Sequence, residues 1–177
     1  MKFDYIIIGA GSAGCVLANR LSKNPNNNVG VFEAGNSSDI WKVKMPLALL
    51  YTMHDPKYNW KYYSEPEPHL NNRRLFCPRG KMIGGCSAHN GMVFVRGNRN
   101  DYERWESFGL KSWSYDKILP YFKKIENWSG GENQYRGSLG LLPVNQSKNN
   151  NPLFKAFLNA SSEAAHKINP DMNGEYQ

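Results

Sequence analysis

A glycine-rich turn near the N-terminus constrains the fold more than any other feature of the 177-residue sequence. The apolar run YIIIGAG begins at Tyr5, ends in glycines and is typical of a short strand buried on both faces. SAGCVLANRLSKN follows with helical spacing of its apolar residues, and VGVFEAG then predicts a second short strand. Residues 1–35 therefore predict a strand–helix–strand unit, the beginning of a Rossmann-like α/β domain.

The glycines of the turn, Gly9, Gly11 and Gly14, satisfy the pattern G-x-G-x-x-G. In such a turn the first glycine permits a sharp reversal and the second lets the backbone approach a pyrophosphate, while the third lets helix and strand pack closely. The predicted helix begins near Ser12 and Ala13, so its first amide groups and the positive end of its dipole face the same place. These five residues are predicted to bind a dinucleotide.

Glu33 stands at the end of the second predicted strand, 19 residues beyond Gly14. An acid at this place can accept hydrogen bonds from a ribose diol, and it completes the sequence context that makes the glycine pattern specific. The alternative is a structural turn with a solvated charge at the strand end. The turn by itself leaves open whether the dinucleotide is FAD or NAD.

A second motif lies in the stretch CPRGKMIGGCSAHNGMVFVRGNRNDYERW, residues 77–105. It resembles the signature of the glucose–methanol–choline (GMC) family of flavin oxidoreductases, and is most similar to the choline dehydrogenase and choline oxidase branch. The positions that match the family pattern are Pro78, Arg79, Gly80, Lys81, Gly84, Gly85, Ser87, Asn90 and Gly91. Further blocks resemble the family in the same order along the chain, including FEAGNSSD, YNWKYYSEPEP, SWSYDKILPYFKKIENW and MNGEYQ.

The resemblance implies FAD as the cofactor, with adenine and pyrophosphate at the first turn and the flavin ring near a loop at residues 78–97. Glycines in this loop would let backbone amides approach the ring edge, and an asparagine can both donate and accept hydrogen bonds there. A surface hairpin with incidental glycines is the alternative. The residues of the loop that the resemblance assigns to the cofactor are Gly84, Gly85, Cys86, His89, Asn90, Gly91 and Val93.

Two of these residues depart from the family pattern. Cys86 stands where serine is commoner, and is expected to be a small buried packing residue. His89 stands where an aliphatic residue is usual. Some family members with a similar Cys-Ser-x-His-Asn sequence attach the 8α-methyl carbon of the flavin to this histidine. The resemblance therefore implies covalent FAD on His89, which needs a neutral imidazole as nucleophile. A packing or solvent-facing histidine is the alternative.

Residues 1–177 are expected to form the N-terminal part of the FAD-binding domain of a larger GMC fold, truncated and without the substrate domain. Residues 36–110 are predicted as a long extended segment, with one helix around MPLALLYTM, and residues 111–177 as a mostly helical segment. Amphipathic helices are predicted in SYDKILPYFKKIENW and in NPLFKAFLNASSEAAHKI. Asn151 is the expected cap of the second helix, with Pro152 at its first position.

No catalytic residue is assigned to this chain. In the family the catalytic histidine and its partner lie far downstream, and none of His54, His69 and His166 stands in a matching context. The expected function is the FAD-binding part of an alcohol oxidoreductase, inactive alone. Its expected partners are a small-molecule alcohol and a separately encoded C-terminal half.

Three further hypotheses are open at the level of sequence. The chain could be a non-catalytic truncated remnant, or a fragment of an NAD-dependent dehydrogenase that uses only the first turn. The aromatic residues at 58–63 could form a cage for a quaternary ammonium substrate, with core packing as the alternative role.

Composition excludes several classes of function. The net charge is +7, but the 22 basic residues are scattered rather than gathered in a run, which does not favour nucleic-acid binding. The three cysteines form no C-x-x-C pair, so neither a metal site nor a disulfide framework is predicted. The sequence has no signal-peptide pattern, and its apolar run is too short to span a bilayer. A cytoplasmic location is expected, with peripheral membrane association as an alternative.

Overall fold

The computed structural model describes residues 2–148 and 150–177, which form two compact units, Met1–Val93 and Phe94–Gln177. Each unit is described by itself. The α-helices and strands of the first are β1 (Tyr5–Ile8), α1 (Ser12–Leu21), β2 (Val29–Phe32), α2 (Trp41–Lys44), α3 (Leu49–His54), β3 (Tyr62–Tyr63) and β4 (Phe76–Cys77). Those of the second are α4 (Arg99–Ser107), α5 (Tyr115–Ile125), β5 (Glu126–Trp128), β6 (Leu142–Val144) and α6 (Pro152–Glu163). Short 3-10 helices are η1 (Pro46–Ala48), η2 (Pro68–Leu70), η3 (Gly85–Ala88) and η4 (Lys111–Trp113).

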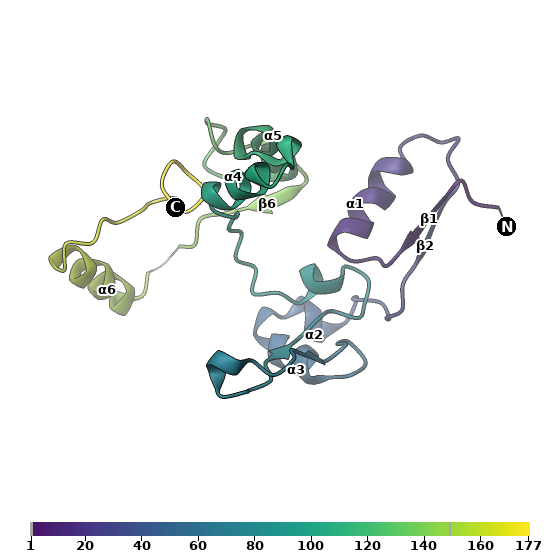
Figure 1. Ribbon diagram of the computed structural model, residues 1–177, viewed down its shortest axis with the longest axis horizontal. Helices are drawn as coiled ribbons and strands as arrows, with labels where there is room; N and C mark the ends of the chain where they lie inside the picture. The colour runs from purple at the N-terminus through teal and green to yellow at the C-terminus, as the bar shows by residue number, and fades with distance from the viewer. Residues whose placement is uncertain (1, 149) are drawn as a thin grey trace. The chain divides into compact units, whose positions relative to one another are not determined.

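The predicted strand–helix–strand unit is present at the N-terminus. β1 and β2 pair in parallel, with Tyr5 opposite Val29, and α1 runs alongside both strands (Figure 1). The expectation that the first strand is buried on both faces is wrong for the described residues. Ile7 is buried, whereas Ile8 on the opposite face is 82% exposed. The reason is that this sheet has two strands in the described part of the chain, and α1 packs on the face of Ile7 and leaves the opposite face uncovered.

Most of the remaining first unit is irregular backbone held by short pairings. β3 and β4 pair antiparallel, and Asn59 forms an isolated antiparallel bridge with Gly80. The helix predicted around MPLALLYTM is present as η1 followed by α3. Met82, fully buried, and Ala48 contribute to the core of this region.

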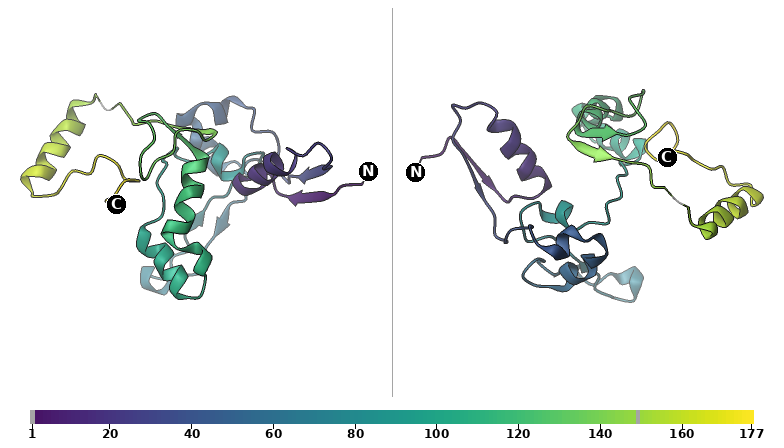
Figure 2. Two further views of the ribbon diagram at one scale, coloured as in Figure 1. Left: turned by 90° about the horizontal axis from the view of Figure 1, so that it is seen from above. Right: turned by 180° about the vertical axis from the view of Figure 1, so that it is seen from behind.

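The second unit contains the two helices that the sequence predicts and one that it does not. α5 and α6 fall inside the predicted stretches, and the side chain of Asn151 caps α6 by accepting from the amide of Leu153 at 2.9 Å. The additional helix, α4, begins after Asn98 and lies beside α5, as Figures 1 and 2 show. Its sequence RNDYERWES is dominated by charged residues, so it has no continuous apolar stripe.

A buried network of charges holds the second unit together. The carboxylate of Glu126 lies 2.5 Å from the Arg96 guanidinium and 3.3 Å from that of Arg136, and all three side chains are almost fully buried. Arg136 also pairs with Asp171 at 2.9 Å, and the Asn173 side chain accepts from the Arg96 amide at 2.8 Å. The network therefore joins the start of the unit, β5 and the loop after it to the C-terminal segment.

Replacing Glu126 with glutamine should destabilise the second unit by about 3 kcal/mol, because two buried guanidinium groups would lose their shared counter-charge. Urea unfolding followed by tryptophan fluorescence measures the change. Glu132→Gln is the matched control, since Glu132 is exposed and its ion pair with Lys123 contributes little. Equal unfolding free energies for the two variants would contradict the assignment.

None of the helices in the described residues has the length and the apolar character that crossing a membrane requires.

Candidate cofactor site

The glycines of the first turn have three different environments. Gly9 has a φ of +92°, a backbone conformation that other residues rarely adopt. A Cβ on Gly14 would lie 1.9 Å from the carbonyl oxygen of Gly9, so α1 approaches the end of β1 more closely than any side chain allows. A Cβ on Gly11 would meet no atom of the described residues within 4 Å. The turn is therefore tight on its inner side and open at Gly11.

The N-terminus of α1 is suited to an anion. Gly11 occupies the capping position, and no side chain in the described part of the chain caps the helix there. The first turn carries no acidic residue, so the first amide groups, including those of Ser12 and Ala13, keep their capacity to bind a negative group. A phosphate would fit this position because it would satisfy these amides and lie at the positive end of the helix dipole.

Glu33 is fixed beside the turn by two backbone amides. One carboxylate oxygen accepts from the amide of Ala10 at 2.7 Å, and the other accepts from the amide of Gly35 at 2.8 Å. Each oxygen has a further lone pair, so these contacts orient the carboxylate without using all of its accepting capacity. The sequence indicated an acid at this strand end but gave no sign of the two amide contacts.

The second motif lies directly against the first turn. The amide of Gly84 donates to the carbonyl of Ala10 at 2.6 Å, and the amide of Ile83 donates to Asn36 at 3.0 Å. A Cβ on Gly85 would lie 2.8 Å from the Cα of Gly11, so the two backbones touch. The contacts of Gly84 with Ala10 and of Gly85 with Gly11 thus bring together residues that are 74 positions apart in the sequence.

Glycine is required within the second loop as well, because Gly84 and Gly85 have φ values of +90° and +53°. Cys86, the second residue of η3, is exposed, so the expectation of a buried packing residue is wrong. Its sulfur accepts from the amide of Gly80 at 3.3 Å, and this contact closes the loop on itself. A thiol, like the commoner serine hydroxyl, can make this contact.

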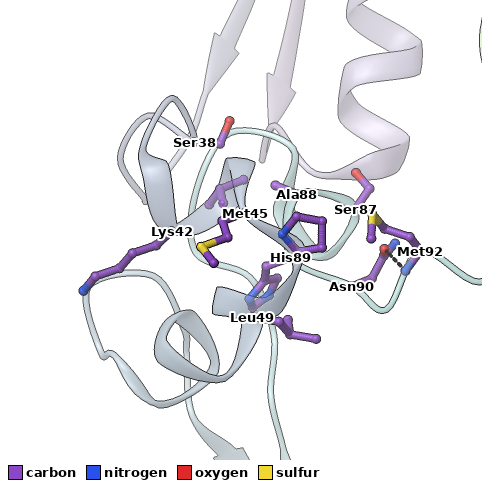
Figure 3. Close-up of a pocket in the computed structure, with 11 residues that line it drawn as sticks. Ser38, Lys42, Met45, Leu49, Ser87, Ala88, His89, Asn90 and Met92 are labelled. Atoms are coloured by element: carbon purple, nitrogen blue, oxygen red, sulfur yellow. Dashed lines mark hydrogen bonds between the residues drawn. The ribbon is translucent and has the colours of Figure 1, made fainter.

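His89 lines a cavity of about 340 Å³ beside the second loop (Figure 3). The imidazole is half-buried, and its Nδ1 is buried without a hydrogen-bond partner among the described residues. Burial lowers the pKa of His89 below its usual 6.5, so the neutral imidazole is favoured at neutral pH. Residues that line the cavity are Ser38, Lys42, Val43, Met45, Pro46, Leu49, Ser87, Ala88, His89, Asn90 and Met92.

Of the other assigned residues after His89, Asn90 lines this cavity, whereas Gly91 and Val93 do not. Asn90 lines it and accepts from the amide of Met92 at 2.8 Å, which leaves the amide nitrogen of its side chain for other contacts. Gly91 is exposed, and a Cβ there would meet nothing within 4 Å among the described residues. Val93 is 80% exposed and does not line the cavity. Their contacts with a cofactor remain predictions.

The side chains beside His89 in the cavity are a part of the site that the sequence did not indicate. Figure 3 shows Met45 and Leu49 beside the imidazole, and both come from the helical segment at residues 41–54. The stretch MPLALLYTM predicted a helix, but it did not indicate that this helix lies beside His89. No group of three or more His, Cys, Asp or Glu side chains in residues 2–148 and 150–177 could hold a metal ion.

The aromatic residues at 58–63 do not form a cage. Trp60 and Tyr62 stack with their ring centroids 6.0 Å apart, and the ammonium of Lys81 lies 4.7 Å from the centroid of Trp60. A second cation would be repelled by Lys81 and would find that ring partly covered.

Comparison with known proteins places the whole chain in one group. A family model described as GMC oxidoreductase matches residues 3–177. The chain is 51% identical to an oxygen-dependent choline dehydrogenase of Sinorhizobium fredii over 177 residues, and 48% identical to one of Vibrio vulnificus over 179 residues. It spans only 32% of the length of each of these enzymes, while 100% and 99% of the chain is covered.

Solved structures give the same result for the fold. Pyridoxine 4-oxidase from Mesorbium loti is similar with a TM-score of 0.83 and 32% identity, over 92% of this chain and 32% of that one. A formate oxidase of Aspergillus oryzae, studied for its FAD modification, is similar with a TM-score of 0.86 and 26% identity, over 99% of this chain and 32% of that one. The expected Rossmann-like α/β fold, as an incomplete part of a larger one, is confirmed.

Proposed function

The chain belongs to the GMC oxidoreductase family, and we propose that it is the FAD-binding part of an enzyme that oxidises an alcohol group of a small molecule. The observation that carries this proposal is the contact between the two motifs, in which Gly84 donates to Ala10 and Gly85 touches Gly11. An NAD-dependent dehydrogenase would use the first turn alone. It would leave the second loop and the His89 cavity without a role.

Different residues of the site would bind different parts of the cofactor. The amides at the start of α1 would bind the pyrophosphate, and Glu33, held by its two amide contacts, would accept from a ribose hydroxyl. The second loop and the His89 cavity would receive the flavin end. When bound, FAD supplies a two-electron acceptor for a hydride from the carbon that carries the hydroxyl group.

We propose further that His89 holds the cofactor covalently, through an imidazole nitrogen bonded to the 8α-methyl carbon of the flavin. Its buried Nδ1 lacks a hydrogen-bond partner among the described residues, and burial keeps the ring neutral. A neutral ring nitrogen has the lone pair that a new N–C bond requires. Forming this bond would break one N–H and one C–H bond, and the two protons and two electrons released would be taken up by the flavin itself, which dissolved oxygen would then return to its yellow oxidised form.

The chain alone is expected to be inactive, because the family's catalytic histidine has no counterpart here and the chain spans about a third of its curated relatives. Both dehydrogenase relatives act on choline by name, so choline is the substrate that we propose to test first. A non-catalytic remnant is the second candidate, and the experiment below distinguishes the two.

The experiment that tests the function uses the chain together with the two-thirds of the Sinorhizobium fredii enzyme that it does not match, co-expressed and purified as a complex. We call this complex the complemented protein. It should be yellow, and choline added without oxygen should bleach its flavin absorbance. A yellow complex that choline and other alcohols fail to bleach would favour the remnant.

Replacing Trp60 with phenylalanine in the complemented protein should leave the KM for choline unchanged, since Trp60 is engaged by Tyr62 and Lys81 rather than by substrate. Steady-state kinetics with choline measure this. A several-fold rise in KM would restore the aromatic cage as a substrate site.

A further inference from the structure

The second unit contains an apolar cavity that the cofactor site does not use. It lies between α4, η4 and α5 and has a volume of about 530 Å³. Its lining consists mainly of aromatic and aliphatic side chains: Tyr102, Trp105, Ser112, Trp113, Ile118, Tyr121, Phe122 and Ile125. We call it the aromatic cavity.

The inner wall of the aromatic cavity is built from mutually packed rings. Tyr102 meets Trp105 and Phe122 edge-to-face, with centroid distances of 5.5 and 6.0 Å, and Trp105 meets Trp113 in the same way at 5.8 Å. Ile118 is buried behind them. Because these contacts fix the rings, the cavity is preformed and would lose little conformational entropy on being filled.

Its outer edge is apolar and open. Tyr121 is 66% exposed, and Trp113 and Ile125 are nearly half exposed. Such a cluster of large apolar side chains at the surface marks an interaction site more often than an ordinary surface. Tryptophan and tyrosine are also the residue types that contribute most to protein–protein binding.

Several charged side chains on the elements around the cavity are paired within the chain. Because the lining itself carries no charged side chain, the cavity favours an uncharged, apolar partner surface. The polar groups of the lining are few: the hydroxyls of Ser112 and the two tyrosines, and the indole N–H groups of the two tryptophans. The ion pairs are Arg99–Asp116 at 2.6 Å, Lys117–Glu106 at 3.7 Å and Lys123–Glu132 at 3.2 Å.

We propose that the aromatic cavity is the docking surface for an apolar segment of the polypeptide that completes the enzyme, a proposal that rests on the proposed function. This chain matches 32% of the length of its curated relatives, so an enzyme of their size contains about twice as much further polypeptide. Part of that polypeptide must cover apolar surface of this chain, and the aromatic cavity is a preformed place for it.

The test measures binding of the chain to the separately produced two-thirds of the Sinorhizobium fredii enzyme that it does not match. Tyr121→Lys places a charge at the open edge of the cavity, where the exposed side chain is not needed for folding. The matched control is Leu139→Lys, at an apolar residue of the same unit that is 90% exposed and lies outside the cavity. We expect Tyr121→Lys to weaken binding at least tenfold and Leu139→Lys to leave it unchanged.

Acrylamide quenching of tryptophan fluorescence gives a second readout, because Trp113 should become protected when the partner binds. Ile125→Lys provides a second cavity variant if circular dichroism shows that Tyr121→Lys is misfolded. Unchanged binding by the folded cavity variants, or unchanged quenching in the complex, would overturn the proposal. So would a homodimer of this chain that Tyr121→Lys dissociates, since the occupant would then be a second copy. Flavin absorbance of the complex is measured separately, so a colourless complex that still binds would count against the proposed function alone.

Discussion

Alanine in place of His89 should release all of the flavin from the protein under denaturing conditions. After acid precipitation of the complemented protein, the yellow colour should pellet with the unmodified chain and stay in the supernatant with His89→Ala. All of the flavin is expected to move from the pellet to the supernatant, because a single covalent bond is what keeps it with the precipitated protein. It follows from the cavity beside the second loop, in which the buried Nδ1 of His89 has no hydrogen-bond partner among the described residues.

His54→Ala is the matched control, since His54 belongs to the same unit but stacks on Phe76 and does not line the cavity. Its colour should pellet as in the unmodified protein. If the unmodified protein itself leaves all of its colour in the supernatant, the linkage does not exist and His89 is a packing residue.

The covalent bond between His89 and the flavin should also form in mildly acidic solution. Burial lowers the pKa of His89 below 6.5, so the neutral, nucleophilic form is retained as the pH falls through 6.5 and is lost only below the lowered pKa. Mixing the colourless apoprotein with FAD at a series of pH values and scoring the pelleted colour would show this. A yield that already falls by half near pH 6.5 would mean that the imidazole is not buried in the assembled site.

Valine in place of Gly14 should abolish flavin binding through the fold, whereas alanine in place of Gly11 should abolish it without disturbing the fold. A Cβ at Gly14 would lie 1.9 Å from the backbone oxygen of Gly9, so α1 would have to separate from β1, at a cost on the order of 3 kcal/mol or more. A Cβ at Gly11 meets nothing within 4 Å in the described residues, and fills only the space that a pyrophosphate needs.

Urea unfolding and flavin absorbance, measured on the same preparations of the complemented protein, separate the two effects. Asn19→Val, at an exposed position of α1, controls for the low helix propensity of valine and should bind flavin normally. A stable Gly14→Val protein with full flavin content, or a Gly11→Ala protein that binds flavin as before, would contradict the assignment of the turn.

The sequence was sufficient for the elements whose patterns are local. β1, α1 and β2 could be predicted because an apolar run, a helical spacing and a glycine turn follow each other directly in residues 1–35. The cap and first turn of α6 could be predicted from Asn151 and Pro152 for the same reason. α4 could not be, because its packing depends on Tyr102 and Trp105, two rings in an otherwise charged segment.

Tertiary contacts were the part that the sequence could not supply. Glu126 lies near the end of a predicted amphipathic helix, yet it is fully buried between Arg96, 30 residues earlier in the chain, and Arg136, in the loop after β5. Likewise, the pattern around His89 suggested a cofactor contact, but Met45 and Leu49 lie beside the ring only because the helical segment at residues 41–54 folds back over the loop. The resemblance to a family therefore identified the loop as a cofactor contact, and the structure showed which other residues line the cavity beside it.

The most direct test of the central claim is a parallel titration of the purified chain, alone and within the apo form of the complemented protein, with FAD and with NAD. The two motifs meet at Gly11 and Gly85, and that arrangement predicts saturable quenching of FAD fluorescence that excess NAD does not reverse. Gly11→Ala should remove the quenching. Saturable binding of NAD by a protein that leaves FAD fluorescence unchanged would contradict the claim that this chain is the FAD-binding part of an oxidoreductase.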